Sequence, residues 1–316
     1  MDGLKHLVLV VGANPAWQKS VVCNRWEPGE VVRVQLASTA PAGKGFNTAL
    51  SLRTFGKAVE LLSGAGPDAI DWGQACFSQG IGVEMFLLSG PIRTATTIRN
   101  LSTGEVTEMV EEGPAADASA EERLVDQARQ KLPSARAVVV AGTFPPGMSP
   151  RGLLEAISAA NVPVVIDSVP GVRTMREMDR VPAELFVKLN ESEWKAVFGE
   201  TELAEALRAA RRIWPRAHLL ATRGREGALL WEKEGGTHLL TGDPFPADRL
   251  IHPIGAGDAF TAGLVNELVS GAGVLSACLH GMAVARASCF HPLPARFEQV
   301  DLSAELPRVH AEITHV

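Results

Sequence analysis

The feature that most constrains the fold is a regular alternation of short β-rich runs and amphipathic helical segments after about residue 117. The β-rich runs are mostly apolar and cover residues 137–141, 162–167, 185–189, 218–221 and 228–231. Strands buried on both faces of a sheet have this composition, and an intervening helix lets consecutive strands run parallel. The alternation therefore predicts an α/β fold built on a parallel sheet.

The whole chain has the size and composition of one large α/β domain. It has 316 residues, 46% of them hydrophobic, and no repeat or linker divides it. Its formal net charge of -6 argues against a nucleic-acid or anionic-membrane surface. The four cysteines are far apart, which favours reduced thiols and a cytoplasmic setting. The apolar run 7–11 is too short for a membrane span and predicts a first buried strand.

The four residues Gly255-Ala256-Gly257-Asp258 stand at the start of an apolar helical pattern. The backbone N–H groups of Gly255, Ala256 and Gly257 would lie at the positive end of that helix, where they can bind an anion. Asp258 would lie beside this anion, positioned to take a proton from an attacking hydroxyl. The combination suits phosphoryl transfer. A capping aspartate after a glycine turn accounts for the same residues, so the motif alone leaves both interpretations open.

Three segments interrupt the βα rhythm and predict a second, smaller sheet. Residues 31–37, 94–100 and 105–111 are extended in pattern, and residues 101–104 would join the last two as a hairpin. No helix separates these two segments, so we assign all three to a small sheet outside the main one. A small sheet attached to a large α/β core can cover a site and exclude water, which phosphoryl transfer from a nucleotide requires.

Cationic side chains accompany a second glycine-rich turn and the extended segments. Residues 42–47 contain Lys44 and lead into a predicted helix over residues 48–55, with Asn47 at its start. Arg33 and Arg93 lie on or next to the extended segments and can add charge-assisted contacts to a phosphate. Lys44 and Arg93 together predict an acceptor that already carries a phosphate. A capped turn with an incidental lysine, and arginines in solvent, are the alternatives.

Two further loops follow predicted strands and have two interpretations each. Asn190 and Glu193 have the spacing of a capping box, and their amide and carboxylate can also organise hydrated Mg²⁺ near nucleotide phosphates. Residues 222–228 form either an ordinary glycine hairpin or a loop with nucleotide contacts. The chain has no GxxxxGK[ST] motif and no GxGxxG after a strand, which excludes a P-loop and removes the main support for a nicotinamide dehydrogenase.

The motifs taken together, in their order along the chain, resemble the ribokinase/PfkB superfamily of sugar kinases. The resemblance covers nearly all of residues 8–290 and is carried by Asn14-Pro15-Ala16, Gly43-Lys44-Gly45-Phe46-Asn47, Arg93-Thr94, residues 108–114, Gly142-Thr143-Phe144-Pro145-Pro146-Gly147, Asp167-Ser168, residues 188–193, residues 222–227 and residues 255–258. Within the superfamily the chain is similar to the branch of 1-phosphofructokinases and tagatose-6-phosphate kinases.

This resemblance implies a Rossmann-like three-layer α/β/α core with a mainly parallel sheet, a β-sheet lid, and ATP with Mg²⁺ as cofactors. The lid would come from segments of about 14–40 and 92–113 of a single kinase domain, and a homodimer would form through it. The roles it implies are Asp258 as the base, Gly255, Ala256 and Gly257 as the anion hole, Asn190 and Glu193 as magnesium contacts through water, and Lys188, Asn190, Thr222, Gly224 and Gly227 at ATP. On the sugar side we place Asn14, Gln18, Arg33, Gly43, Lys44, Asn47, Arg93 and Thr143.

The chain departs from the family pattern at two positions on the sugar side. Gln18 stands where relatives commonly have an aspartate that binds sugar hydroxyls, and Ala42 replaces the first glycine of GGKG. The expected function is an ATP-dependent kinase for a ketohexose monophosphate of the fructose 1-phosphate, fructose 6-phosphate or tagatose 6-phosphate type. The alternatives are a kinase for an unphosphorylated sugar or nucleoside, and a sugar-phosphate sensor without turnover, for which Gln18 is the suggestive feature.

Overall fold

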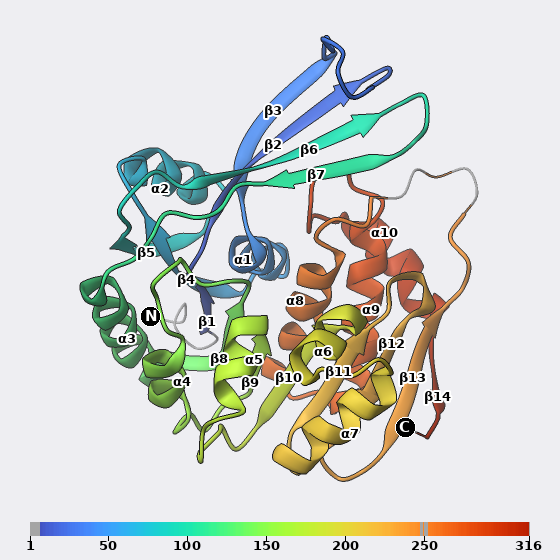
Figure 1. Ribbon diagram of the computed structural model, residues 1–316. Coiled ribbons are helices and arrows are strands. Elements are labelled where there is room, and N and C mark those ends of the chain that lie inside the picture. The colour runs from blue at the N-terminus through green and yellow to red at the C-terminus, as the bar shows by residue number, and fades with distance from the viewer. Residues whose placement is uncertain (1–6, 247–248, 250–251, 316) are drawn as a thin grey trace.

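The computed structural model describes residues 7–246, 249 and 252–315, which form a three-layer α/β/α core with a separate small sheet (Figure 1). In spatial order the ten strands of the large sheet are β14 (Val309–Ile313), β13 (Thr237–Gly242), β12 (Ala228–Trp231), β11 (His218–Thr222), β10 (Leu185–Asn190), β9 (Val164–Asp167), β8 (Ala135–Ala141), β1 (Leu7–Gly12), β4 (Ala58–Ala65) and β5 (Gly82–Leu87). The strands from β11 to β5 run parallel, and β12, β13 and β14 continue the sheet antiparallel. This confirms the predicted mainly parallel sheet.

Helices cover both faces of this sheet because its central strands are apolar on both sides. Every residue of β1 and β9 is buried, for example. One face packs against α3 (Ala118–Lys131), α4 (Arg151–Ile157), α5 (Val169–Met175), α6 (Glu191–Phe198) and α7 (Leu203–Ile213). The other face packs against α1 (Lys44–Thr54), α2 (Ala69–Phe77), α8 (Ala256–Val269) and α9 (Val274–Ser288), and α10 (Gln299–Glu305) contacts α9. The predicted three layers are therefore confirmed.

The small sheet projects from one end of the core (Figure 1). Its strands are β3 (Leu36–Ala42), β2 (Ala16–Cys23), β6 (Arg93–Asn100) and β7 (Val106–Val110), in that spatial order. β6 and β7 form the antiparallel hairpin predicted for residues 94–111, and β6 pairs in parallel with β2. Strands from the first and second quarters of the chain thus meet in one sheet.

The first predicted segment of this sheet was wrong in position. Residues 31–34 have no regular structure, Val31 is 88% exposed, and β3 begins only at Leu36. The physical reason is pairing: β3 aligns with β2 from Val22 opposite Leu36 onward, so the valine-rich run before it has no strand to join. Strand β2 itself was not predicted, because a polar side chain, Gln18, occupies one of its buried positions and weakens the alternating pattern.

Helix α1 begins four residues earlier than predicted. Gly43, between β3 and α1, has φ 107°, and the helix starts at Lys44. Gly45 in its first turn packs directly on β1, where an added Cβ would lie 2.4 Å from the Cα of Gly12. Asn47 is consequently a buried residue inside the helix and does not cap it, which rules out the alternative of a turn capped by this residue.

Candidate active site

Asp258 lies in the first turn of α8 and is only 5% exposed. Asn47 on α1 donates a hydrogen bond from Nδ2 to Oδ2 of Asp258 at 2.7 Å. Burial raises the pKa of Asp258 to about 6, and the carboxylate of Asp167 adds to this effect, whereas Lys44, Lys188 and Asn47 oppose it. The carboxylate is therefore available at neutral pH, and its pKa is close enough to 7 for proton transfer.

The predicted anion-binding turn leads directly into Asp258. Gly255 has φ 81°, which favours glycine, and it precedes the first residue of α8. At Gly257 an added Cβ would lie 3.4 Å from Nζ of Lys188, so the ammonium group faces the turn. The N–H of Ala256 donates to the carbonyl of Pro253 at 3.2 Å. The turn combines the positive end of a helix with a lysine, which is an arrangement that binds phosphate.

A buried carboxylate, Asp167 at the end of β9, connects the parts of this site. Lys44 lies 3.0 Å from Oδ1, Lys188 lies 2.5 Å from Oδ2, and Thr261 on α8 donates to Oδ2 at 3.0 Å. Burial by itself would raise the pKa of Asp167, but the two ammonium groups hold it well below its usual range. Asp167 thus stays ionised and fixes both lysines next to α8.

Lys44 lies among three carboxylates. Besides Asp167 it contacts Oε1 of Glu193 at 3.3 Å. Burial would lower the pKa of Lys44, but Asp167, Asp258 and Glu193 together raise it above its ordinary value. The sequence placed Lys44 with the sugar and Lys188 with ATP, and the structure brings these two cations together on one carboxylate.

Sequence reasoning did not name Asp167 or Thr261 as site residues. A signal existed for Asp167, because an acidic residue directly after a predicted buried strand lies at the carboxyl end of the sheet, where ligands bind in open α/β folds. Thr261 had none, since one threonine on an apolar helix is an ordinary core residue.

Asn190 and Glu193 form a complete capping box at the start of α6. Asn190 Oδ1 accepts from the N–H of Glu193 at 2.8 Å, and Glu193 Oε2 accepts from the N–H of Asn190 at 2.9 Å. Glu193 Oε1 also contacts Lys44. Among the described residues no cluster of three or more His, Cys, Asp or Glu side chains could hold a metal. The side-chain oxygens of Asn190 and Glu193 fit Mg²⁺ only as contacts to its bound waters, which is how this ion commonly binds beside phosphates.

The predicted nucleotide loop lies at the end of β11. Thr222 is next to Asn190 in the β10–β11 register, so these two residues share one edge of the sheet. Gly224 and Gly227 have φ 57° and 95° in the turn that joins β11 to β12. An added Cβ at Gly227 would lie 1.9 Å from the carbonyl oxygen of Leu240 on β13, so the close approach of that strand requires a glycine here.

The sugar-side residues form a mainly neutral group. Asn14 donates from Nδ2 to Oγ1 of Thr143 at 3.0 Å, and its buried Oδ1 has no hydrogen-bond partner among the described residues. Gln18 donates to Oγ1 of Thr97 on the neighbouring strand β6 at 2.7 Å. Gly43 turns the chain from β3 into α1. Amide and hydroxyl groups therefore dominate this side of the site.

The two predicted sugar-side arginines differ in position. Arg93 is half-buried and donates to the carbonyl oxygens of Asn14 and Pro15, both at 3.3 Å. Burial lowers its pKa, and Glu108 acts in the opposite direction. Arg33 is exposed in the loop before β3, because the predicted strand at this position is not formed. Only Arg93 lies with the other sugar-side residues.

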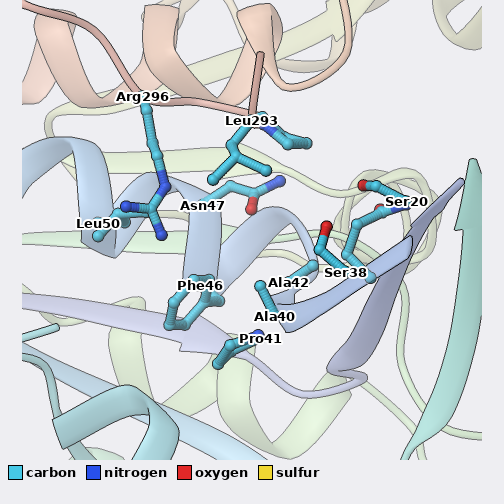
Figure 2. Close-up of a pocket in the computed structure, with 12 residues that line it drawn as sticks. Ser20, Ser38, Ala40, Pro41, Ala42, Phe46, Asn47, Leu50, Leu293 and Arg296 are labelled. Atoms are coloured by element: carbon cyan, nitrogen blue, oxygen red, sulfur yellow. The ribbon is translucent and has the colours of Figure 1, made fainter. Parts of the chain in front are cut away.

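A pocket opens between the small sheet, α1 and a segment near the C-terminus (Figure 2). Gln18, Ser38 and Ala42 line it from the small sheet, Asn47 from α1, and Arg296 from the C-terminal segment. Because Asn47 also holds the carboxylate of Asp258, a hydroxyl group of a molecule in this pocket would lie near the predicted base.

The architecture and this site are those of a ribokinase-like phosphotransferase. The family model of the pfkB family carbohydrate kinases matches residues 5–298. The chain belongs to the pfkB family of carbohydrate kinases, and it is therefore a phosphotransferase with an alcohol group as acceptor. The resemblance noted in the sequence is confirmed, including its branch.

The chain is similar to several 1-phosphofructokinases and to solved structures of the same fold. It is 27% identical over 273 residues to 1-phosphofructokinase of Escherichia coli strain K12, covering 84% of this chain and 85% of that protein. A 1-phosphofructokinase of Haemophilus influenzae is 26% identical over 82% of this chain and 83% of that protein. A possible 1-phosphofructokinase of Thermotoga maritima superposes with a TM-score of 0.87 at 19% identity, covering 98% and 100% of the two chains. Phosphofructokinase-2 of Escherichia coli superposes with a TM-score of 0.82 at 19% identity, covering 96% of this chain and 98% of that chain.

Proposed function

We propose that this protein is an ATP-dependent kinase that phosphorylates a hydroxyl group of a ketohexose monophosphate. The observation that carries the proposal is the position of Asp258, a buried carboxylate with a pKa of about 6, beside a glycine turn and two lysines. The named relatives at 26–27% identity are 1-phosphofructokinases, which supports this acceptor class.

The proposed mechanism assigns one task to each part of the site. ATP supplies the γ-phosphoryl group, and Asn190 and Glu193 would contact Mg²⁺ through its waters, where the ion would offset the charge of the ATP phosphates. Asp258 takes the proton of the acceptor hydroxyl, whose oxygen forms the new bond to the γ-phosphorus. The bond from that phosphorus to the β–γ bridging oxygen breaks, and ADP leaves. Lys188 and the turn at Gly257 bind the transferring group, since both face the same space.

The second candidate, a kinase for an unphosphorylated sugar or nucleoside, has one observation in its favour. Lys44 and Arg93, which were predicted to bind a phosphate on the acceptor, already contact Asp167, Glu193 and backbone carbonyls. The polar groups of the small sheet that line the pocket are neutral. A sensor without turnover is less well supported, because a sensor has no need for a buried carboxylate with a pKa near 6.

A screen of ADP release decides between these candidates. Wild-type protein is incubated with ATP, Mg²⁺ and, in turn, fructose 1-phosphate, fructose 6-phosphate, tagatose 6-phosphate, the unphosphorylated sugars and nucleosides. Asp258→Asn serves as the blank for contaminating kinases. We expect the highest kcat/KM with a ketohexose monophosphate. Higher kcat/KM with unphosphorylated acceptors would establish the second candidate, and no turnover with any of them would favour the sensor.

We further propose that the small sheet acts as the lid of the site and as a homodimer interface. Its strands and the loop before β3 expose several large apolar side chains, among them Val31, Leu36, Met109 and Val110. Exposed apolar patches commonly mark an interface, and a second copy of the chain supplies a self-complementary partner. In light scattering, Leu36→Glu with Met109→Glu should give a smaller particle than wild type. Ile70→Glu, an exposed apolar position on α2, is the control, and equal masses for all three proteins would contradict the interface.

The cellular location of the protein is proposed from its cysteines and its helices. All four cysteines are buried and free, which suits a reducing compartment. Among the described residues no helix is both long enough and apolar enough to cross a membrane. We keep the cytoplasm as the predicted location.

A further inference from the structure

Arg296 is the one ionisable residue among those that line the pocket described above, all of which lie in the described part of the chain. The polar groups around it are the amides of Gln18 and Asn47 and two serine hydroxyls. In Figure 2 the Arg296 side chain extends from the C-terminal segment toward α1, next to Leu50 and Asn47. The pocket therefore has a single positive charge, on the same side as the residue that holds Asp258.

Arg296 also lacks a carboxylate partner among the described residues, in contrast to Lys44. Its guanidinium donates to Oε1 of Gln79, a neutral amide, and it takes part in no ion pair among the described residues. Burial lowers its pKa, without a compensating negative group. Lys44, by comparison, contacts Asp167 and Glu193. A partly desolvated guanidinium without a counter-ion is a favourable partner for an anionic ligand.

The backbone beside Arg296 is held in an unusual conformation. Ala295 is fully buried with φ 54°, the only positive φ of a residue other than glycine in the described chain. Ser51 donates to the carbonyl oxygen of Ala295 at 2.5 Å, and the backbone nitrogen of Ala295 lies 2.5 Å from the position that a Cβ of Gly255 would take. Strained residues of this kind persist where the surroundings fix them, and they cluster at ligand sites. The segment is thus fixed to α1 and to the anion-binding turn at once.

We propose that Arg296 binds the phosphate group that the acceptor already carries, while the acceptor hydroxyl points past Asn47 to Asp258. This inference rests on the proposed function and adds a specificity-determining residue to it. The guanidinium would form charge-assisted, bidentate hydrogen bonds with a phosphate monoester. Because Ala295 packs on Gly255, the acceptor phosphate and the transferring phosphoryl group would be positioned by one continuous segment of backbone.

The test compares steady-state kinetics of wild type, Arg296→Gln, Arg296→Lys and Gln79→Ala with the best sugar phosphate and its unphosphorylated sugar. Loss of a charge-assisted contact should raise KM for the sugar phosphate about 10- to 100-fold in Arg296→Gln, with KM for ATP unchanged. Arg296→Lys should recover part of the loss. Gln79→Ala removes the same internal hydrogen bond but keeps the charge, so it should behave like wild type. Thermal unfolding of each variant verifies the fold.

A matched variant in the neighbouring cavity sharpens the test. Arg99 lines a second pocket with His252, whose Nε2 lies 3.1 Å from its guanidinium. We expect Arg99→Gln to leave KM for the sugar phosphate within about threefold of wild type. The inference is overturned if Arg99→Gln and not Arg296→Gln raises this KM, if Gln79→Ala reproduces the effect, or if KM for sugar phosphate and unphosphorylated sugar rise equally. Failure of the proposed function is distinct, because wild type itself would then prefer unphosphorylated acceptors.

Discussion

The two halves of the site are built from opposite kinds of interaction. On the proposed phosphoryl-transfer side, the buried residues Asp167, Lys188 and Asp258 form an interlocked group of charges with the half-buried Lys44. On the acceptor side, the polar side chains that line the pocket are neutral apart from Arg296, and one of them, Gln18, donates to Thr97 on the neighbouring strand. Removing one member of a buried charge group leaves the others uncompensated, whereas a neutral pair can be exchanged at small cost. The residues proposed to carry out phosphoryl transfer are therefore tightly constrained in this fold, whereas the residues proposed to select the sugar are not.

The largest effect should come from the proposed base on the charged side. Asp258→Asn keeps the shape and a hydrogen-bond acceptor for Asn47 but cannot take a proton, so kcat should fall about 10²- to 10⁴-fold with little change in KM for ATP. Single-turnover kinetics with the best acceptor measures the chemical step. A folded variant with near-normal turnover would remove Asp258 as the base.

The next effect is a loss of stability, which should follow when one carboxylate of the buried charge group is neutralised. Asp167→Asn leaves Lys188, only 3% exposed, without its carboxylate partner, and the free energy of unfolding should fall by about 3–5 kcal/mol. Urea denaturation at pH 7.5 measures the loss. Glu60→Gln is the control, since its pair with Lys131 is partly exposed and should contribute below about 1 kcal/mol. Similar losses for the two variants would contradict a special role for Asp167.

The raised pKa of Asp258 predicts two pH dependences. Because the base must be ionised, kcat/KM should decrease about tenfold per pH unit below about 6. The folded pKa lies above the unfolded value of about 3.9, so the stability that the protonated carboxyl contributes is present below pH ~4 and is lost as pH rises to about 6. Urea midpoints between pH 4 and 8 should show this loss in wild type and not in Asp258→Asn. Parallel profiles would argue against the raised pKa.

The smallest effect should come from the neutral side. In Gln18→Asp a carboxylate replaces an amide that donates to Thr97, and it can bind sugar hydroxyls with charge-assisted strength. The relative kcat/KM among sugar phosphates should change by roughly tenfold, since neutral and charge-assisted hydrogen bonds differ by about 1 kcal/mol or more. A panel of acceptors measures the rank order. An unaltered order would show that Gln18 does not set specificity.

The sequence alone predicted the parallel sheet, the hairpin of β6 and β7, and the turn before Asp258. These features depend on local patterns: apolar runs of strand length, a polar turn between extended segments, and small residues before a helix. The capping box, one of two interpretations of Asn190 and Glu193, follows from a local pattern as well, since both partners lie within one helical turn. Local pattern failed at residues 31–37, where a valine-rich run has no neighbouring strand to pair with.

Only the tertiary structure decided which side chains meet. Asn47 contacts Asp258 across 211 residues of sequence, and Lys44 contacts Asp167 across 123. No periodic pattern in the sequence predicts contacts between residues so far apart along the chain. These contacts follow from how α1 and α8 pack on the same face of the sheet. The pKa of Asp258 has the same origin, since burial and neighbouring charges set it. The sequence thus determined the elements and the residue types, and the packing of distant elements determined the electrostatics that make Asp258 suitable as a base.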